Sequence, residues 1–144
     1  LLCDITVVAE TARMGDTHVR VGLVAGDGGS TIWPLLIGVN RAKEYLMRAT
    51  VFTGKEAAER GIANHAVPAD KVMDEAMRIA QEINRLPPLA VQWTKVSANA
   101  IVKQQLNLAF DSGIAFEALS MLSADHNEAC KAFVEKRKPA YKGA

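Results

Sequence analysis

The stretch VGLVAGDGGSTIWPLLIG, residues 21–38, decides how the first part of the chain is interpreted. Three glycines, Gly26, Gly28 and Gly29, surround Asp27, and an apolar segment long enough for a short helix follows them. Glycine carries an entropic cost inside regular structure, so this loose backbone needs a cause. The loop either brings free backbone N–H groups to a ligand or turns a tight corner between a strand and a helix.

Two common phosphate-binding loops do not fit this stretch. A P-loop needs the pattern GxxxxGK followed by Ser or Thr, and a dinucleotide loop needs GxGxxG after a strand with an acidic residue about 20 positions later. Neither pattern occurs here. The loop does lead into a predicted helix, whose free N–H groups and dipole favour a partial negative charge.

The composition is that of an ordinary globular domain. The 144 residues are 49% hydrophobic and 23% charged, with a net charge of +1. This charge argues against general nucleic-acid binding, and no stretch approaches the roughly 18 apolar residues of a membrane span. Cys3 and Cys130 lie far apart without a CxxC spacing, so we expect reduced, buried thiols, a cytoplasmic location and no metal site.

The chain opens on LLCDITVVAE, residues 1–10, without an initial Met or a signal-peptide pattern. The β-branched apolar run over residues 5–9 predicts a buried strand. A strand so near the start needs pairing partners, and we expect some of them to lie before Leu1.

Beyond this strand the pattern is mostly helical. The spacing of apolar residues, caps and prolines predicts helices over 29–37, 40–48, 53–61, 69–85, 88–102, 104–122 and 123–136, with a short extended segment at 62–68. Thr53 is the expected N-cap of the third helix and Gly61 its C-terminal stop. Pro87 and Pro88 end the amphipathic helix over 69–85.

Taken in order, several segments resemble the C-terminal half of the enoyl-CoA hydratase/isomerase family, also called the crotonase family. They are the glycine loop, TGKEAAERGIANHAVP at 53–68, PPLAVQWTK at 87–95 and SADHNEACKAFVEKRKPAYKG at 123–143. The resemblance covers essentially the whole chain, and its most specific parts are AFVEKRKPAYKG at 132–143 and the TG…A…G segment within 53–61. Where the family has PGAGG, this chain has Ala25 for the proline and Asp27 for the alanine.

The resemblance implies an α/β fold class. Residues 1–68 would form the end of a crotonase-like β-β-α spiral core and one wall of an acyl pocket, and residues 69–144 a helical region for trimerisation and for covering the CoA. In the family, residues that would precede Leu1 provide both oxyanion-hole N–H groups and usually a first catalytic glutamate. Loss of one such donor typically costs about 100- to 1,000-fold in rate. We therefore expect a homo-oligomer, a trimer or hexamer, and possibly a second chain that carries the missing N-terminal half.

His18 stands where hydratases of the family have a glutamate that helps to activate water, preceded by proline where this chain has Thr17. A histidine can act as a general acid or base near neutral pH because its unperturbed pKa is about 6.5. It can equally serve as a hydrogen-bonding residue in a pocket of altered specificity. Both interpretations are open at this point.

Ala25, Gly26 and Gly28 would line the acyl pocket by the same resemblance. Asp27 would add a catalytic carboxylate beside it, or would cap the helix that follows the loop.

Two further residues are predicted to bind the CoA portion of the substrate. By resemblance Lys136 would lie near the CoA phosphates and Phe116 near the adenine, whereas Lys136 could also belong to a solubilising basic tail at a helix C-terminus. His65 and His126 lie in polar surroundings, and we expect both to be exposed to solvent.

These observations predict an acyl-CoA enzyme that hydrates 2-enoyl-CoA thioesters through a thioester enolate and needs no cofactor beyond the CoA of its substrate. The chain would be a fragment of that enzyme without its N-terminal half. One alternative is another acyl-CoA reaction of the family, either isomerisation or thioester hydrolysis, that uses His18 or Asp27. The other is a truncated, non-catalytic chain that only contributes assembly contacts.

Overall fold

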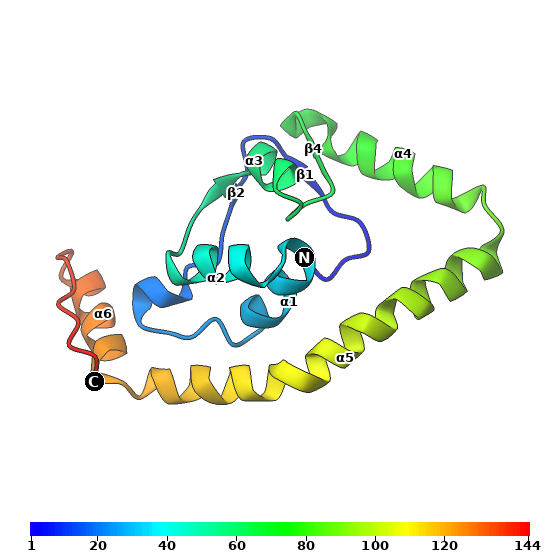
Figure 1. The fold of residues 1–144 in the computed structure, drawn as a ribbon. Helices are drawn as coiled ribbons and strands as arrows, with labels where there is room; N and C mark the ends of the chain where they lie inside the picture. Colours follow the sequence, from blue (N-terminus) through cyan, green and yellow to red (C-terminus); the bar gives the residue numbers. More distant parts are fainter. The chain divides into compact units, whose positions relative to one another are not determined.

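The computed structural model describes residues 1–144 and divides into two compact units (Figure 1). The first unit contains Leu1–Met14 and Phe52–Gln105, and the second contains Gly15–Val51 and Leu106–Ala144. The predicted division at residue 68 separates regions by function, whereas these two units are separated by packing. That functional division stays a prediction.

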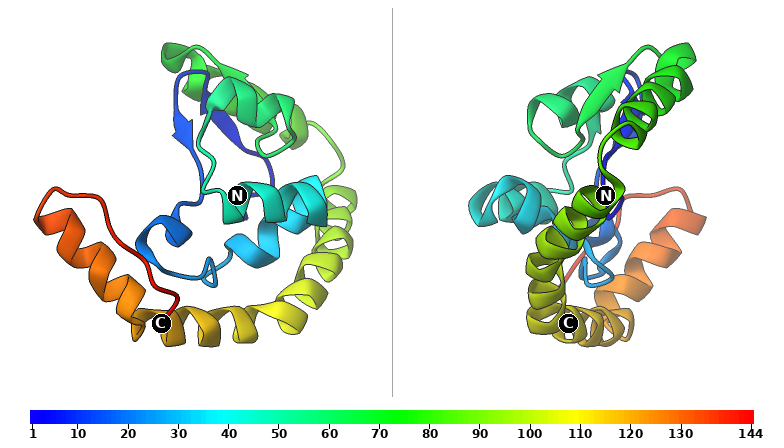
Figure 2. Two further views of the ribbon diagram at one scale, coloured as in Figure 1. Left: turned by 60° about the vertical axis from the view of Figure 1, so that its left-hand side comes forward. Right: turned by 90° about the vertical axis from the view of Figure 1, so that its right-hand side faces the viewer.

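Short strands and one helix form the centre of the first unit. Strand β1 (Val7–Ala9) pairs in parallel with β4 (His65–Val67), and β2 (Arg13–Met14) pairs antiparallel with β3 (Phe52–Thr53). Helix α3 (Gly54–Glu59) follows β3 directly and contacts β1 (Figure 2). Strand β1 is shorter than the run predicted over 5–9, and the two-residue strands β2 and β3 were not predicted because so short a segment has no periodicity.

The start of α3 is fixed by its own residues. Thr53 Oγ1 accepts a hydrogen bond from the Glu56 backbone N–H at 3.2 Å, and Glu56 Oε2 accepts one from the Thr53 backbone N–H at 2.8 Å. This capping box satisfies N–H groups that have no partner within the helix. After the helix Gly61 has φ of +78°, a conformation that favours glycine. The predicted cap and stop are both confirmed.

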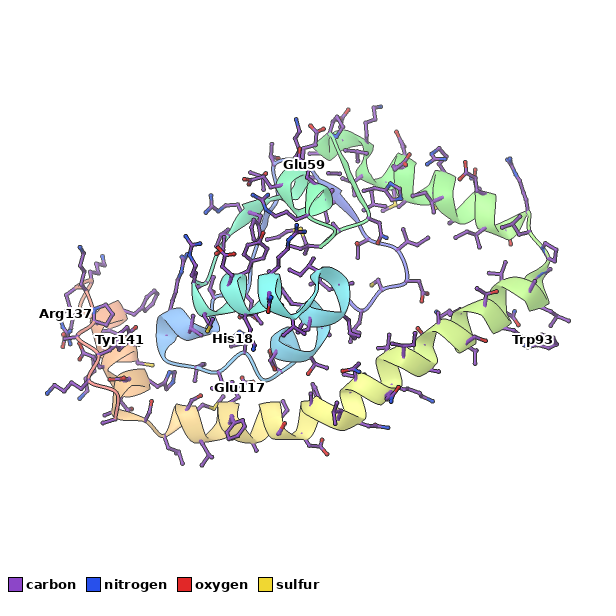
Figure 3. All side chains as sticks on the ribbon, viewed as in Figure 1. His18, Glu59, Trp93, Glu117, Arg137 and Tyr141 are labelled. Atoms are coloured by element: carbon purple, nitrogen blue, oxygen red, sulfur yellow. The ribbon has the colours of Figure 1, made fainter.

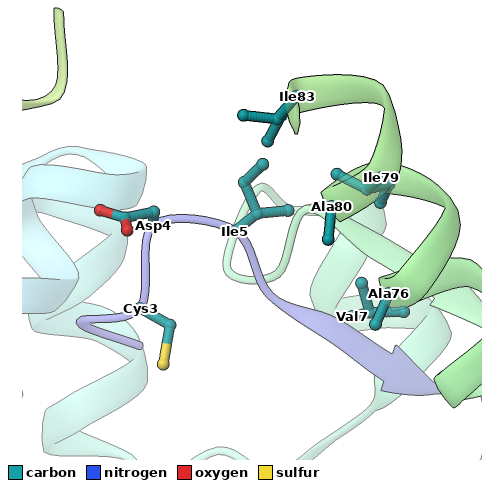
Figure 4. A pocket seen from close by; sticks show the side chains of 8 residues that line it. All are labelled: Cys3, Asp4, Ile5, Val7, Ala76, Ile79, Ala80 and Ile83. Atoms are coloured by element: carbon teal, nitrogen blue, oxygen red, sulfur yellow. The ribbon is translucent and has the colours of Figure 1, made fainter. Parts of the chain in front are cut away.

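Helix α4 (Val72–Asn84) follows a short 3₁₀ turn, η2 (Ala69–Lys71), and packs beside β1. A groove of about 320 Å³ lies between them and is lined by Cys3, Asp4, Ile5, Val7, Ala76, Ile79, Ala80 and Ile83. Figure 4 shows the side chains of Ile5 and Val7 on one side and those of α4 on the other. The predicted amphipathic helix therefore turns most of its apolar face toward the start of the chain.

The second unit contains a 3₁₀ turn, η1 (His18–Val21), and helices α1 (Gly29–Ile37), α2 (Val39–Met47) and α6 (Ala124–Val134). Helices α1 and α2 pack together, and α6 packs on η1. Trp33 of α1 and Ala42 of α2 are buried. All three helices fall within about one residue of the predicted ranges at their starts.

Helix α5 (Pro88–Met121) is one continuous helix of 34 residues that contributes to both units. The predicted break between 102 and 104 is wrong, because Val102, Lys103 and Gln104 include no glycine or proline to end a helix. None of the helices is both long and apolar enough to cross a membrane.

Cys3 and Cys130 are both unpaired, as expected, but both are exposed. The prediction of buried thiols is therefore wrong. Cys3 lies in the irregular segment before β1, and α6 buries Ala129 and Ala132 rather than Cys130. The spacing of the two cysteines in the sequence does not show which side of a helix faces the core.

Candidate functional site

His18 is held by the acidic residue two positions before it. Its Nδ1 lies 2.8 Å from Asp16 Oδ1, and the same oxygen accepts a hydrogen bond from the His18 backbone N–H at 3.3 Å. The Asp16 side chain is 9% exposed and that of His18 is 27% exposed. Because an ionised carboxylate can only accept, the proton of the neutral ring lies on Nδ1 and the lone pair on Nε2.

The glycine loop makes room for Asp16. A Cβ atom added at Gly29, the first residue of α1, would lie 2.1 Å from Asp16 Oδ2. The carboxylate therefore rests against the N-terminus of α1, where the helix dipole favours a negative charge. One glycine of the GDGGS loop is thus explained by a close approach that no larger residue permits.

The other side of the ring faces two more carboxylates. His18 Nε2 lies 3.7 Å from Asp27 Oδ2. Nitrogen or carboxylate oxygen atoms of His18, Asp27 and Glu117 all lie within 4.8 Å of one another. Figure 3 labels His18 before α1 and Glu117 on α5, and the two side chains lie close together. These residues and Asp16 form one cluster, called the His18 cluster below.

Tight packing of the loop on α5 brings Glu117 to this place. A Cβ added at Gly26 would lie 2.0 Å from the Gly113 carbonyl oxygen and 2.9 Å from Glu117 Cβ. Gly113 itself is buried within α5. The two glycines thus allow the loop to lie directly on the helix one turn before Glu117.

Glu117 also contains an unsatisfied polar atom. Its Oε2 is buried and has no hydrogen-bond partner within the protein. Leaving a buried acceptor unpaired costs about 1–3 kcal/mol, so native structures rarely keep one without a reason. A water molecule or a substrate group that donates to Oε2 would remove this cost.

The electrostatics of the cluster act on the His18 ring. Burial by itself lowers the pKa of His18, but the hydrogen bond with Asp16 and the negative charges of Asp16, Asp27 and Glu117 outweigh it. The net effect raises the pKa of His18 above its ordinary value of 6.5. The cluster therefore favours the protonated imidazole, which is the form that a general base has after it accepts a proton.

Asp27 does not cap α1, so that alternative is wrong. The N-cap residue is Gly28, with φ of 145° and no side-chain cap hydrogen bond. Asp27 lies one position too early to bond the first N–H groups, and its side chain is 57% exposed beside His18. Its catalytic role stays a prediction.

The other predicted binding residues are spread over the second unit. Ala25, Gly26 and Gly28 are buried in the loop, next to the His18 cluster. Phe116 is exposed on α5, and Lys136 is exposed just after α6 with φ of 54°. Neither belongs to the cluster, and the contact of all five with substrate stays a prediction.

The two remaining histidines differ from each other. His65 on β4 is exposed, as expected. His126 is half-buried, so the prediction that it is exposed is wrong, and its Nδ1 lies 2.7 Å from the Val21 carbonyl oxygen.

Asp16 and Glu117 were not predicted from the sequence as members of the site. Asp16 could have been found from its place two positions before His18, a spacing that suits a local side-chain hydrogen bond. For Glu117 the signal was Gly113, a glycine inside a helix four positions earlier, since such a residue usually marks close packing.

The sequence model of the enoyl-CoA hydratase/isomerase family matches residues 1–144 of the chain. The chain belongs to the enoyl-CoA hydratase/isomerase family. Human mitochondrial methylglutaconyl-CoA hydratase is 35% identical over 151 residues, which cover 99% of the chain and 43% of that protein. The predicted family and the α/β fold class are thereby confirmed, and the chain spans about half the length of the curated relatives it matches.

Similarity to solved structures supports the same family assignment. A carnitinyl-CoA dehydratase from Mycobacterium avium 104 has a TM-score of 0.90 and 27% identity, covering 98% of the chain and 56% of its own. A beta-diketone hydrolase from the cyanobacterium Anabaena, bound to (S)-3-oxocyclohexyl acetic acid, has a TM-score of 0.76 and 27% identity, covering 86% of the chain and 48% of its own. Members of the enoyl-CoA hydratase/isomerase fold thus include proteins named for hydration, dehydration and hydrolysis.

Proposed function

We propose that the protein containing this chain hydrates a 2-enoyl-CoA thioester, with His18 as the base that activates the attacking water. The observation that carries the proposal is the oriented imidazole, whose Nδ1 faces Asp16 and whose Nε2 faces Asp27, with the Glu117 carboxylate in the same cluster. The relatives named as CoA hydratases support the same reaction.

In the proposed pose the attacking water molecule lies between the His18 ring and the carboxylate of Glu117. Two hydrogen bonds of about 2.8 Å from one water reach acceptors about 4.5 Å apart, and the nitrogen and oxygen atoms of the cluster lie within 4.8 Å of one another. The water would donate one proton to His18 Nε2 and the other to a carboxylate oxygen of Glu117. This pose leaves an oxygen lone pair free to attack the substrate.

The proposed hydration forms one bond from oxygen to carbon and moves one proton through His18. The water oxygen bonds to C3 of the enoyl group as its proton moves to His18 Nε2. The electron pair of the double bond moves toward the thioester oxygen as an enolate, and C2 then takes up the proton from His18 Nε2, which returns the ring to its neutral form. Asp16 stabilises the imidazolium that forms in the first step, because its carboxylate already accepts the proton of Nδ1.

The remaining parts of the proposal concern binding and assembly. Ala25, Gly26 and Gly28 would line the acyl group, Phe116 would pack near the adenine, and Lys136 would meet a CoA phosphate. No cofactor beyond the CoA of the substrate is required by these steps. We place the protein in the cytoplasm.

We further propose a homo-oligomer, a trimer or hexamer. The support is apolar side chains that the chain leaves exposed on its last two helices. Leu108 on α5 is 75% exposed and Phe133 on α6 is 83% exposed. Surfaces of this kind usually mark protein contacts. Sedimentation of the 144-residue chain should show association, and a stable, cooperatively folded monomer would argue against this part.

The activity is tested on the product of the whole reading frame that contains this sequence. Crotonyl-CoA hydration is followed by loss of the enoyl thioester absorbance. His18→Gln should lower the maximal rate by about 100-fold or more, the usual worth of a positioned proton acceptor. His65→Gln, at an exposed histidine of the first unit, is the matched control and should leave the rate unchanged. If the His18→Gln enzyme keeps most of its activity, His18 is not the base.

The similarity to the Anabaena beta-diketone hydrolase favours a second candidate, hydrolysis of a β-diketone. The same activated water would attack one carbonyl carbon, the bond between that carbon and the central carbon would break, and the resulting enolate would take up a proton. The product is a keto acid rather than a hydroxyacyl thioester. Offering a cyclic β-diketone and crotonyl-CoA to the same preparation, with products analysed by NMR, separates the two candidates.

A further inference from the structure

Cys130 and His126 lie one turn apart on α6, outside the His18 cluster. Cys130 Sγ lies 3.6 Å from His126 Nε2, and the thiol is exposed. His126 Nδ1 lies 2.7 Å from the Val21 carbonyl oxygen. A carbonyl can only accept, so the proton of the neutral ring lies on Nδ1 and Nε2 offers its lone pair to the thiol.

The ring is held in this orientation by the packing of η1 on α6. Gly22, which ends η1, has φ of +70°, and a Cβ there would lie 2.9 Å from the His126 backbone nitrogen. That nitrogen donates to Ser123 Oγ at 3.0 Å, which fixes the first turn of α6. Tyr141 near the C-terminus donates its hydroxyl to the Arg20 carbonyl. A nucleophile, a base and a group that orients the base are therefore assembled from separate parts of the chain.

We propose that Cys130 is a covalent modification site for soft electrophiles of the α,β-unsaturated carbonyl class, with His126 as its base. The Cys130 sulfur bonds to the β-carbon of the electrophile as the thiol proton moves to His126 Nε2. The π electrons pass to the α-carbon, which then takes the proton from the ring. The product is a thioether, and no oxidant or second reactant is needed. This inference is independent of the reaction proposed above.

Cys3 provides an internal comparison. Both cysteines are unpaired and exposed, but Cys3 Sγ has no hydrogen bond to a histidine. Both thiols of one folded molecule meet the same reagent at the same pH, and both are exposed. A difference between their rates of modification therefore measures the effect of the neighbouring side chains.

The experiment treats the folded product of the whole reading frame with acrylamide at neutral pH and follows adducts on Cys3 and Cys130 by peptide mass spectrometry. We expect Cys130 to react at least about tenfold faster than Cys3, a modest share of what a positioned base can contribute. In guanidinium chloride the contact between Cys130 and His126 is lost, so the two cysteines should react at similar rates.

Two variants identify the base. His126→Gln should bring the rate of Cys130 down to that of Cys3, whereas His65→Gln should leave the difference unchanged. Equal rates for the two cysteines in the folded wild type would overturn the proposal, and this outcome needs no variant. So would a fast Cys130 that survives His126→Gln, since the base would then be another group.

Discussion

Replacing Asp16 by asparagine tests the orientation of His18 with the least change in shape. The carboxylate is nearly buried and its Oδ1 lies 2.8 Å from His18 Nδ1. A hydrogen bond that involves a charged group is worth about 1.5–3 kcal/mol. If this stabilisation acts on the imidazolium formed in the proposed reaction, its loss corresponds to about 10- to 100-fold in the maximal rate.

The pH profile should change together with the rate. The hydrogen bond with Asp16 is the largest cause that raises the pKa of His18. If the neutral ring is the base, activity is lost as pH falls through that pKa, which lies above 6.5 in the wild type. Asp16→Asn lowers the pKa of His18, so the acid limb of the profile should move to lower pH.

The assay measures crotonyl-CoA hydration across pH for the product of the whole reading frame, with circular dichroism to confirm folding. Asp70→Asn is the control, because its side chain is 76% exposed in η2. An Asp16→Asn enzyme with an unmoved acid limb and a rate within about twofold of wild type would refute the reasoning, since a purely structural Asp16 predicts that result.

Three further predictions concern other parts of the second unit. Gly26→Ala should destabilise the fold by about 1–3 kcal/mol or more in urea unfolding, because its Cβ would lie 2.0 Å from the Gly113 carbonyl oxygen; unchanged stability would contradict this packing. Lys136→Ala should raise the KM for the CoA thioester more strongly at low salt and leave kcat nearly unchanged, as expected for a remote phosphate contact; an unchanged KM at low salt would exclude the contact. The hydrogen bond with Arg137 lowers the pKa of Glu128 to about 2, so the contact of the C-terminal tail with α6 should be intact above the ordinary pKa of 4.5 and be lost as pH falls toward about 2, which amide exchange of the tail would detect.

The sequence by itself determined most of the helices. Thr53 and Glu56 lie three positions apart and cap α3 with their own side chains, and the apolar spacing over 29–37 placed α1 correctly. These features depend on neighbours within one or two turns, so they are visible in a short window of sequence. The break predicted in α5 failed for a related reason, because a weak local signal was given more weight than the helix-forming residues around it.

Only the tertiary structure decided which chemical groups meet. His18 and Asp27 were candidates from the sequence, but the approach of Glu117 depends on a loop and a helix that pack through Gly26 and Gly113. The same holds for Val21 and His126, whose contact orients the ring beside Cys130. Such contacts join residues far apart in the chain, and their closeness is set by steric fit between whole elements rather than by the local conformational preferences that a sequence pattern records.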